Sequence, residues 1–79
     1  MGSRAKEAAI FGTAAKALSA ADKKIGEVHE ALQELVYSYS PTCKQNELWY
    51  RGNLAAIQAA LRSVLEKLQE DEEYWANYE

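Results

Sequence analysis

Apolar side chains recur along the chain in alternating steps of three and four residues. The first series is Phe11, Ala14, Leu18, Ala21, Ile25, Val28, Leu32, Leu35 and Tyr39. The second series is Tyr50, Leu54, Ile57, Leu61, Val64, Leu68, Asp71, Trp75 and Tyr78, with one break at the aspartate. This spacing is a heptad repeat, in which one stripe of an α-helix faces a partner helix. The pattern predicts two long helices whose apolar stripes face each other.

A segment that contains the single proline separates the two series. Pro41 disfavours helical backbone angles at the residue before it, so the first helix should end there. Thr42 and Gln45 have the spacing of a capping box, which satisfies free N–H groups at the start of a helix. We therefore expect a helix over about 4–38, a turn over about 39–42 and a helix over about 43–76. So short a connection makes the two helices antiparallel.

The fold class is therefore all-α, with residues 1–79 forming a single helical hairpin domain. Residues 19–22 also have capping-box spacing, which leaves a short break near 12–19 as an alternative. Gly12 and Gly26 each follow an inner position by one residue, so we expect both to face outward. The low content of glycine and proline, 4 and 1 residues, disfavours a loop-rich or all-β chain.

Several large apolar side chains fall outside the two stripes. They are Ile10, Tyr37, Val36, Leu48, Trp49, Leu65 and Tyr74. A stripe this wide is expected when each helix touches two neighbours, which favours a homodimer of hairpins that forms a four-helix bundle. Two alternatives stay open: another protein supplies the missing helices, or these residues are ordinary surface side chains. Alanine makes up much of the 48% hydrophobic content, so a lone hairpin would be marginally stable.

The aromatic residues fall into two groups, one near the turn and one at the opposite end of the hairpin. Their role is either to pin the ends of an alanine-lined bundle or to bind a partner, since Trp and Tyr are enriched at binding hot spots. Trp49 is the foremost binding candidate because the stripe gives it no packing role. The full set of candidate partner-binding residues is Trp49, Tyr37, Tyr50, Leu48, Tyr74 and Trp75.

Charge is unevenly distributed along this acidic chain, which has 9 Lys and Arg residues against 12 Asp and Glu residues and a net charge of -3. The charged residues within 1–24 are mostly basic, and those within 70–79 are all acidic. An antiparallel hairpin would bring the two segments side by side. The basic residues are too few for nucleic-acid binding. No apolar run is long enough for a membrane span.

The residue types of catalytic and metal sites are scarce. His29 is the single histidine, and no second ligand has the spacing of a helical metal site. Cys43 is the single cysteine, and no base and orienting group accompany it. We therefore expect no catalytic residues, no metal and no cofactor, and a protein that is not an enzyme. A lone cysteine fits the cytoplasm, although secretion without a cleaved signal remains open.

The tetrapeptide Trp49-Tyr50-Arg51-Gly52 near the bend of a helical hairpin resembles the WXG100 family of small secreted bacterial proteins. Members of that family are hairpins with a Trp-x-Gly turn that dimerise into four-helix bundles and leave through type VII secretion machinery. This chain has two residues between Trp and Gly instead of one, and Tyr74 is followed four residues later by Tyr78 rather than by an acidic residue. The resemblance implies a secreted helical bundle.

These observations predict a non-enzymatic protein-binding module: a self-associating hairpin that acts as an adaptor, a chaperone-like partner or an inhibitor. Its partners would be a second copy of itself and another protein, with no nucleic acid and no membrane. Two other functions are kept as alternatives. One is the secreted WXG100-like bundle, and the other is a bundle that sequesters a small molecule between subunits near its aromatic ends.

Overall fold

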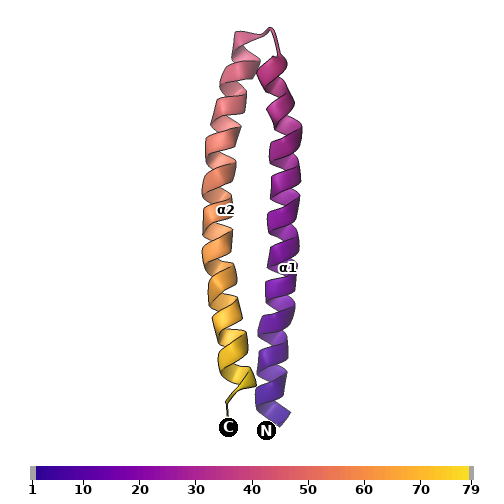
Figure 1. Cartoon of the computed structure of the whole chain (residues 1–79), viewed down its shortest axis with the longest axis vertical. Helices are drawn as coiled ribbons and strands as arrows, with labels where there is room; N and C mark the ends of the chain where they lie inside the picture. The colour runs from indigo at the N-terminus through magenta and orange to yellow at the C-terminus, as the bar shows by residue number, and fades with distance from the viewer. Residues whose placement is uncertain (1, 79) are drawn as a thin grey trace.

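Two long antiparallel helices make up the protein. The computed structural model describes residues 2–78, with side chains from Arg4 onward. Its elements are α1 (Gly2–Gln33), a short 3-10 helix η1 (Glu34–Tyr37) and α2 (Pro41–Ala76). The hairpin measures 62 × 15 × 11 Å, and both ends of the described chain lie at the end opposite the turn (Figure 1). The prediction of an all-α protein is confirmed.

The connection between the helices is tighter than the sequence suggested. α1 gives way to η1 after Gln33, and α2 already begins at Pro41. The backbone N–H of Cys43 donates to the Ser40 hydroxyl at 3.3 Å, so Ser40 caps α2. The prediction that Thr42 is the capping residue was therefore wrong, because the hydroxyl just before the proline occupies that position. Proline at the first helical position is favourable, since its missing N–H would have no partner there.

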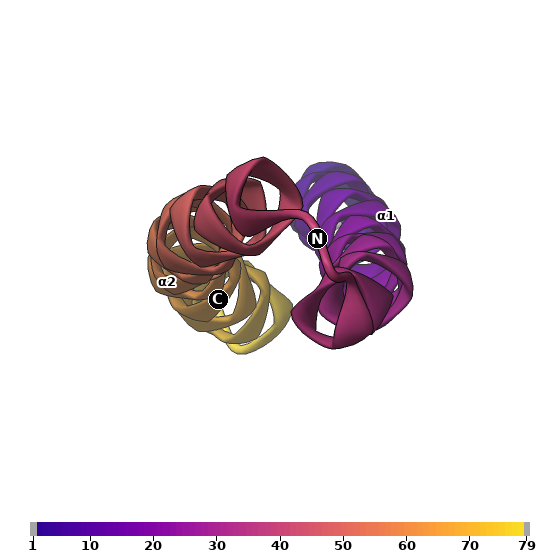
Figure 2. The same ribbon diagram turned by 90° about the horizontal axis from the view of Figure 1, so that it is seen from above.

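α1 runs without interruption from Gly2 to Gln33, so the alternative of a break near 12–19 is wrong. Ser19 lies inside this helix, where the preceding turn already satisfies the backbone N–H groups that a cap would serve. Viewed along the long axis, α1 and α2 wind around each other (Figure 2).

Contacts between the helices define their register. Arg62 Nε lies 3.6 Å from Asp22 Oδ2, and Gln58 Nε2 donates to the Asp22 carbonyl oxygen at 3.5 Å. Nearer the chain ends, Gly12 lies against the side chain of Glu72. Moving up α1 therefore corresponds to moving down α2 by the same number of residues. Side chains at equal height can be paired along the whole hairpin from these contacts.

The half-buried residues between the helices repeat every seven positions, and we use the letters a to g for the heptad, with a and d facing the partner helix. Position d holds Phe11, Leu18, Ile25 and Leu32 in α1 and Leu54, Leu61, Leu68 and Trp75 in α2. Position a holds Ala15, Asp22 and His29 in α1 and Gln58, Leu65 and Glu72 in α2. These d residues are apolar, whereas the a residues are largely polar, and in the antiparallel pair an a residue of one helix lies level with a d residue of the other.

Half of each predicted stripe is therefore misplaced. Tyr39, the last member of the first series, lies in the connection and is fully exposed, so its prediction was wrong. The other d residues lie between the helices as predicted, but the remaining members lie at g, one position before a. Val28, Ile57 and Val64 are exposed instead of facing the partner helix. Leu65, which we expected beside the stripe, lies between the helices. The apolar stripe is centred to one side of the contact that the hairpin makes.

Gly12 and Gly26 do not face outward, so that prediction was also wrong. Both are partly buried at position e, beside the a layer of α2. A Cβ at Gly26 would lie 3.7 Å from Gln58 Nε2, and one at Gly12 would overlap the Glu72 carboxylate. The absence of side chains at these two positions lets long polar groups of α2 lie across α1.

The interior of the hairpin is thin. Among residues 4–78, Ala15 is the one apolar side chain that is buried, with 7% of its surface exposed. The other buried side chain is that of Glu47, which accepts hydrogen bonds from Arg51 Nε at 2.9 Å and from Nη2 at 2.7 Å. This two-bonded pair compensates the cost of removing the carboxylate from water. With so little buried apolar surface, a lone hairpin would be marginally stable.

Candidate functional site: an exposed apolar face

The g and c residues of both helices lie on one side of the hairpin, which we call the apolar face. In α1 they are Ile10, Ala14, Ala17, Ala21, Lys24, Val28, Ala31 and Leu35. In α2 they are Tyr50, Asn53, Ile57, Ala60, Val64, Lys67, Asp71, Tyr74 and Tyr78. Because the helices are antiparallel and both right-handed, position g of α1 lies beside position g of α2. The two stripes therefore merge into one surface that runs the length of the hairpin.

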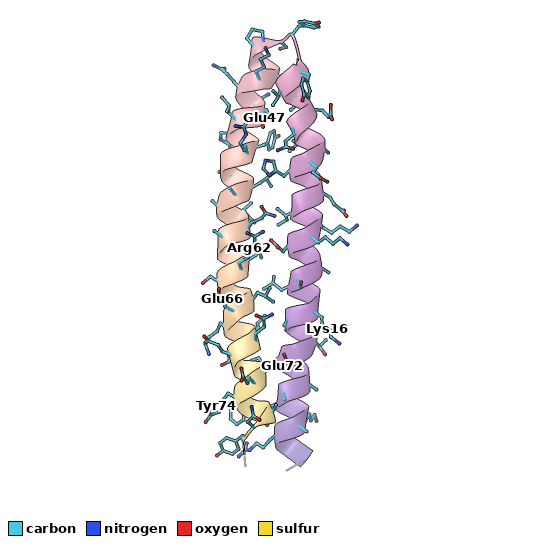
Figure 3. The ribbon with its side chains drawn as sticks, in the orientation of Figure 1. Lys16, Glu47, Arg62, Glu66, Glu72 and Tyr74 are labelled. Atoms are coloured by element: carbon cyan, nitrogen blue, oxygen red, sulfur yellow. The ribbon has the colours of Figure 1, made fainter. Side chains whose placement is uncertain are left out.

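The opposite side carries the e and b residues, and we call it the polar face. A shallow hollow on this side is lined by residues from both helices, including Gly26 and Arg62, both at position e. This agrees with the antiparallel geometry, since e residues of the two helices share a side just as g residues do. Arg62 points toward α1, while Lys16 and Glu66 at position b project away from the hairpin (Figure 3).

Branched apolar side chains on the apolar face stand in solvent. Ile10 is 58% exposed, Val64 52%, Val28 48% and Ile57 46%. Single exposed apolar residues are common, but a row of them on adjoining helices is a candidate interaction surface. The row adjoins the d residues between the helices, so the apolar side chains form one continuous band. The d residues of this band are half-buried between the helices, and the rest of the band is exposed.

Three charged residues interrupt the apolar face: Lys24, which lies 3.2 Å from the Glu27 carboxylate of the same helix, and Lys67 and Asp71 toward the open end. Lys67 donates a hydrogen bond to Asp71 Oδ1 one helical turn later. This hydrogen bond raises the pKa of Lys67 above its ordinary value of 10.5. The pair keeps both charges satisfied within one copy of the chain, so the face contains a local ion pair there rather than an isolated charge.

The turn end presents four of the six residues predicted to bind a partner. Tyr37, Leu48 and Trp49 are exposed, the tryptophan by 62%. Trp49 contacts the Tyr50 ring edge-on, with centroids 5.2 Å apart. Leu48 shares a hollow with Val36 and the Glu47–Arg51 pair, on the polar side of the turn. Of the four, Tyr50 belongs to the apolar face.

The remaining two predicted residues, Tyr74 and Trp75, belong to an aromatic cluster at the open end. Their ring centroids are 4.9 Å apart, and Tyr78 lies 5.2 Å from Trp75. The Arg4 guanidinium lies over both Tyr78 and Trp75, at 4.5 and 5.3 Å from the ring centroids. Such a cation–π contact joins the start of α1 to the end of α2. Trp75 is half-buried and ties the helices together, whereas Tyr74 is exposed.

The expected pairing of basic and acidic ends takes a different form from simple ion pairs. The two segments lie side by side, as predicted (Figure 1). Among residues 4–78, however, the one ion pair between helices joins Asp22 to Arg62, with the opposite polarity. At the open end, Arg4 lies over aromatic rings of α2 and 3.8 Å from the carboxylate of Glu7 on its own helix.

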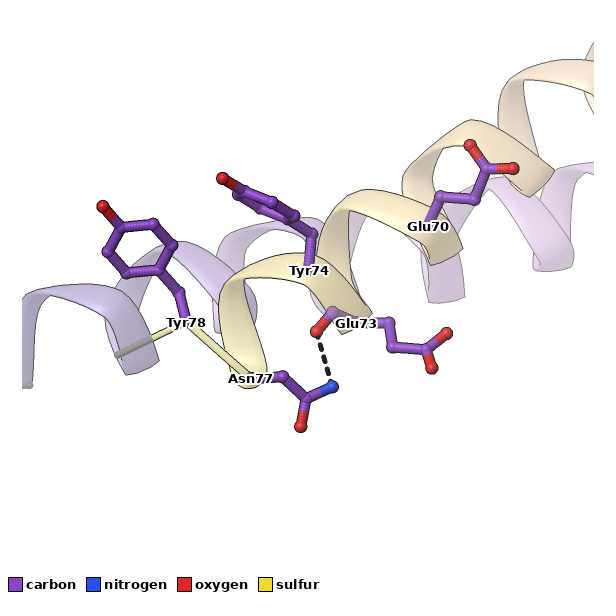
Figure 4. Close-up of a pocket in the computed structure, with 5 residues that line it drawn as sticks. All are labelled: Glu70, Glu73, Tyr74, Asn77 and Tyr78. Atoms are coloured by element: carbon purple, nitrogen blue, oxygen red, sulfur yellow. Dashed lines mark hydrogen bonds between the residues drawn. The ribbon is translucent and has the colours of Figure 1, made fainter.

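A second hollow at the open end involves the same tyrosines. Glu70, Tyr74 and Tyr78 form one row along it, and Glu73 and Asn77 lie on its other side (Figure 4). Asn77 Nδ2 donates to the Glu73 carbonyl oxygen at 2.9 Å. All of its lining residues come from the last turns of α2 and the two residues after it. The hollow is therefore the surface of one helix end, and α1 contributes no wall to it.

The single histidine lies between the helices, and the single cysteine lies at the start of α2. His29 lies between the helices at position a, and its Nε2 atom is buried without a hydrogen-bond partner. Cys43 is half-buried in the first turn of α2. Within residues 2–78, no three His, Cys, Asp or Glu side chains are close enough to share a metal ion. In the same range, no helix combines the length and apolarity needed to cross a membrane.

Sequence reasoning missed two features of this site. Val28, Ile57 and Val64 were assigned to the hairpin interior, because positions d and g have the same spacing of three and four residues as the two positions that one partner helix covers. The pair of buried Glu47 with exposed Arg51 had a visible signal, since an acid four residues before a base is a favourable helical spacing.

No family model matches the chain, and no curated protein or solved structure is similar to it. The tetrapeptide that resembles the WXG100 turn, Trp49 to Gly52, lies within α2, two helical turns after the connection.

Proposed function

We propose that this chain is a non-enzymatic protein-binding module that self-associates through its apolar face into a four-helix bundle. The observation that carries the proposal is the exposure of Val28, Ile57 and Val64 beside half-buried leucines at position d. A helix that contacts two neighbours has this arrangement, with one part of its apolar stripe against each. In a bundle, the d residues would be covered by both neighbours.

Surface area supports the same conclusion. The hairpin exposes 5983 Å². A compact monomer of its mass, 8.8 kDa, would expose about 4,800 Å². The excess of about 1,200 Å² is comparable to the roughly 800 Å² that each partner buries in a standard protein interface. Pairing of two apolar faces would therefore bring the exposed area per chain close to that of a compact protein.

Binding of a different protein is proposed for the turn end. Tyr37, Leu48 and Trp49 lie off the apolar face, so a bundle formed through that face would leave them accessible. Exposed tryptophan and tyrosine next to an arginine are the residue types enriched at binding hot spots. An adaptor or an inhibitor would use such a patch while its apolar faces hold the bundle together.

Sedimentation equilibrium tests self-association with a matched pair of variants. Val64→Lys introduces a charge into the centre of the apolar face, and Ala59→Lys introduces the same charge at an exposed b position one turn away. We expect the wild-type chain and Ala59→Lys to dimerise equally, and Val64→Lys to bind itself at least about 100-fold more weakly, since about 2.7 kcal/mol corresponds to that factor. A wild-type chain that stays monomeric up to about 1 mM, the weakest range of specific affinity, would overturn the proposal.

A second variant tests the turn end separately. Trp49→Ala should leave helicity and self-association unchanged, because the side chain contacts only its neighbour Tyr50 among the aromatic residues described. Circular dichroism and sedimentation measure both quantities. Loss of helicity on this substitution would show that Trp49 packs within the assembly and is not free for another protein.

A further inference from the structure

We propose that the turn end binds an amphipathic segment of another protein, in which one apolar side chain is flanked by an acidic group on one side and a basic group on the other. This inference rests on the proposed role of the turn end in binding a different protein, and it adds the chemistry of that partner. It follows from two adjoining hollows near the turn whose charges have opposite signs.

The two hollows share part of their walls. The first, of about 240 Å³, takes most of its residues from α2 and is lined by Val36, Lys44, Glu47, Leu48 and Arg51. The second, of about 340 Å³, takes most of its residues from the end of α1 and from η1, and is lined by Glu30, Gln33, Glu34, Val36, Tyr37 and Arg51. We call them the Leu48 hollow and the Tyr37 hollow. Because Val36 and Arg51 belong to both, the hollows are neighbouring parts of one surface.

Exposed apolar side chains lie along this surface. Val36 is common to both hollows, Leu48 lines one and Tyr37 lines the other, and all three are exposed. Tyr37 and Leu48 are at positions b and e, on the polar face of the hairpin. A bundle formed through the apolar face would therefore leave them accessible. Adjacent apolar groups from two elements offer contact to an apolar side chain of a partner.

The Leu48 hollow has an excess of positive charge. Glu47 is buried between the helices near the turn (Figure 3), where it accepts hydrogen bonds from Arg51 Nε and Nη2, so these two charges compensate each other. Glu47 uses one edge of the guanidinium, which has five N–H donors in all. Lys44 adds an ammonium group that forms no ion pair within residues 4–78. A carboxylate is the acceptor that suits these donors.

The Tyr37 hollow has an excess of negative charge. Glu30 and Glu34 both line it, and Arg51, the cation among its lining residues, is already paired with Glu47. In the part of the chain whose side chains the structure describes, neither Glu30 nor Glu34 forms an ion pair. A basic group bound beside the tyrosine ring would gain a charge interaction and a cation–π contact together.

The helix ends at the turn reinforce this separation of charge. The C-terminal end of a helix is partly negative, and the N-terminal end is partly positive. Glu30 lies in the last turn of α1 and Lys44 in the first turn of α2, so each side chain has the same sign as the helix end it occupies. Both placements are unfavourable for the hairpin alone. A partner with the opposite charges would stabilise the side chains and the helix ends together.

Charge complementarity therefore specifies both the partner and its direction. The apolar side chain of the partner lies over Val36, its acidic group toward Lys44 and its basic group toward Glu34. A segment that is acidic throughout would meet like charge at the Tyr37 hollow, and one that is basic throughout would meet it at the Leu48 hollow. Like charges across an interface oppose binding and exclude such partners.

Three fragments test the polarity of this surface by NMR of the isotope-labelled chain. Phenylpropionate, phenylpropylamine and phenylpropanol share an apolar group and differ in charge. We expect the carboxylate to shift the backbone amide signals of Lys44 and Leu48, and the amine to shift those of Glu34 and Tyr37. The uncharged alcohol should bind at both hollows, but at least about threefold more weakly at each, which is the size of effect expected from one exposed charge pair.

Variants that remove one charge locate each preference. Lys44→Gln should remove the advantage of the carboxylate at the Leu48 hollow, and Glu34→Gln should weaken binding of the amine at the Tyr37 hollow. Lys16→Gln and Glu66→Gln are the controls. They make the same changes in net charge at exposed b positions away from the turn, and should leave the binding of both fragments unchanged.

The outcomes separate the chemistry of the partner from the proposed function. Division of the two charged fragments between the two hollows supports the inference. Shifts by both charged fragments at the same residues, or shifts centred on Trp49, overturn the charge pattern and keep the turn end as a binding surface. Absence of shifts with all three fragments at about 10 mM overturns the inference, while self-association is measured independently by sedimentation.

Discussion

The two long faces of the hairpin are built from the same two helices, yet they differ in what they expose. On the polar face, Gly12 and Gly26 bring polar side chains of α2 across α1, and lysines and glutamates reach into solvent. On the apolar face, Val28, Ile57 and Val64 stand in water beside half-buried leucines. Water solvates the polar side chains of the first face, whereas exposure to water is unfavourable for the apolar side chains of the second. The difference is the basis on which we propose a partner for the apolar side.

The largest expected effect comes from truncating side chains on each face in turn. The double variant Val28→Ala/Ile57→Ala should lower the free energy of unfolding by about 3 kcal/mol per chain, because it removes branched side chains that the proposed four-helix bundle would bury. The double variant Lys16→Ala/Glu66→Ala, at exposed b positions, should change it by less than about 0.5 kcal/mol. Urea denaturation at one protein concentration measures both. Equal changes in the free energy of unfolding for the two double variants would show that the apolar face is no more important for stability than the polar face.

A smaller, stabilising effect is expected from replacing His29, which lies between the two helices at position a. Its Nε2 atom is buried without a hydrogen-bond partner. Replacing a group of this kind with an apolar one of similar size removes the cost of its desolvation, so His29→Leu should raise the free energy of unfolding by about 1–2 kcal/mol. Gln33→Leu on the polar face is the control and should have little effect. A less stable His29→Leu variant would mean that the imidazole is satisfied in solution.

The glycines of the polar face should respond in different degrees. Gly26→Ala places a Cβ at ordinary contact distance from Gln58, so it should stabilise the helix by about 1 kcal/mol. Gly12→Ala requires the Glu72 side chain to move, so its gain should be smaller. Thermal unfolding followed by circular dichroism compares them, with Gly52→Ala as the unhindered reference. Gly12→Ala and Gly26→Ala variants of equal stability would show that the helices are farther apart at Gly12.

The smallest effect concerns the ion pair on the apolar face. Asp71→Asn weakens the acceptor of the Lys67 hydrogen bond, so the pKa of Lys67 should fall toward 10.5. A raised lysine pKa means that the pair stabilises the folded state below pH 10.5 and that this contribution is lost as the pH rises through the raised pKa. Titration of the lysine by NMR measures the change. An unaltered pKa in Asp71→Asn would show that the pair is open in solution.

The sequence was sufficient for the hairpin, because Pro41 and two heptad series each have a local physical meaning. It was also sufficient for the positions at d, from Leu18 to Trp75. It could not show which half of the wide apolar stripe faces the other helix, since that depends on where polar residues such as Asp22 find partners on α2. Periodicity describes each helix by itself. Whether the residues at position a or those at position g face the partner helix depends on the contacts between both helices.

The candidate site was predicted in part for the same reason. Tyr37, Leu48, Trp49 and Tyr74 lack a place in the stripe and are exposed, as their positions indicated. Trp75 is half-buried between the helices, beneath the Arg4 guanidinium, and this cation–π contact spans the length of the sequence and leaves no local signal. The apolar face itself became visible once the register placed the g positions of both helices side by side.

The three-residue connection at one end, with both ends of the described chain at the other, also determines how the hairpin would respond to force (Figure 1). Pulling on the two ends would load the helices across their width, so the layers would separate one after another from the Arg4 cluster toward the turn. Each step of such unzipping breaks the contacts of one layer only. Pulling along the axis, between the turn and one end, would instead shear every layer at once.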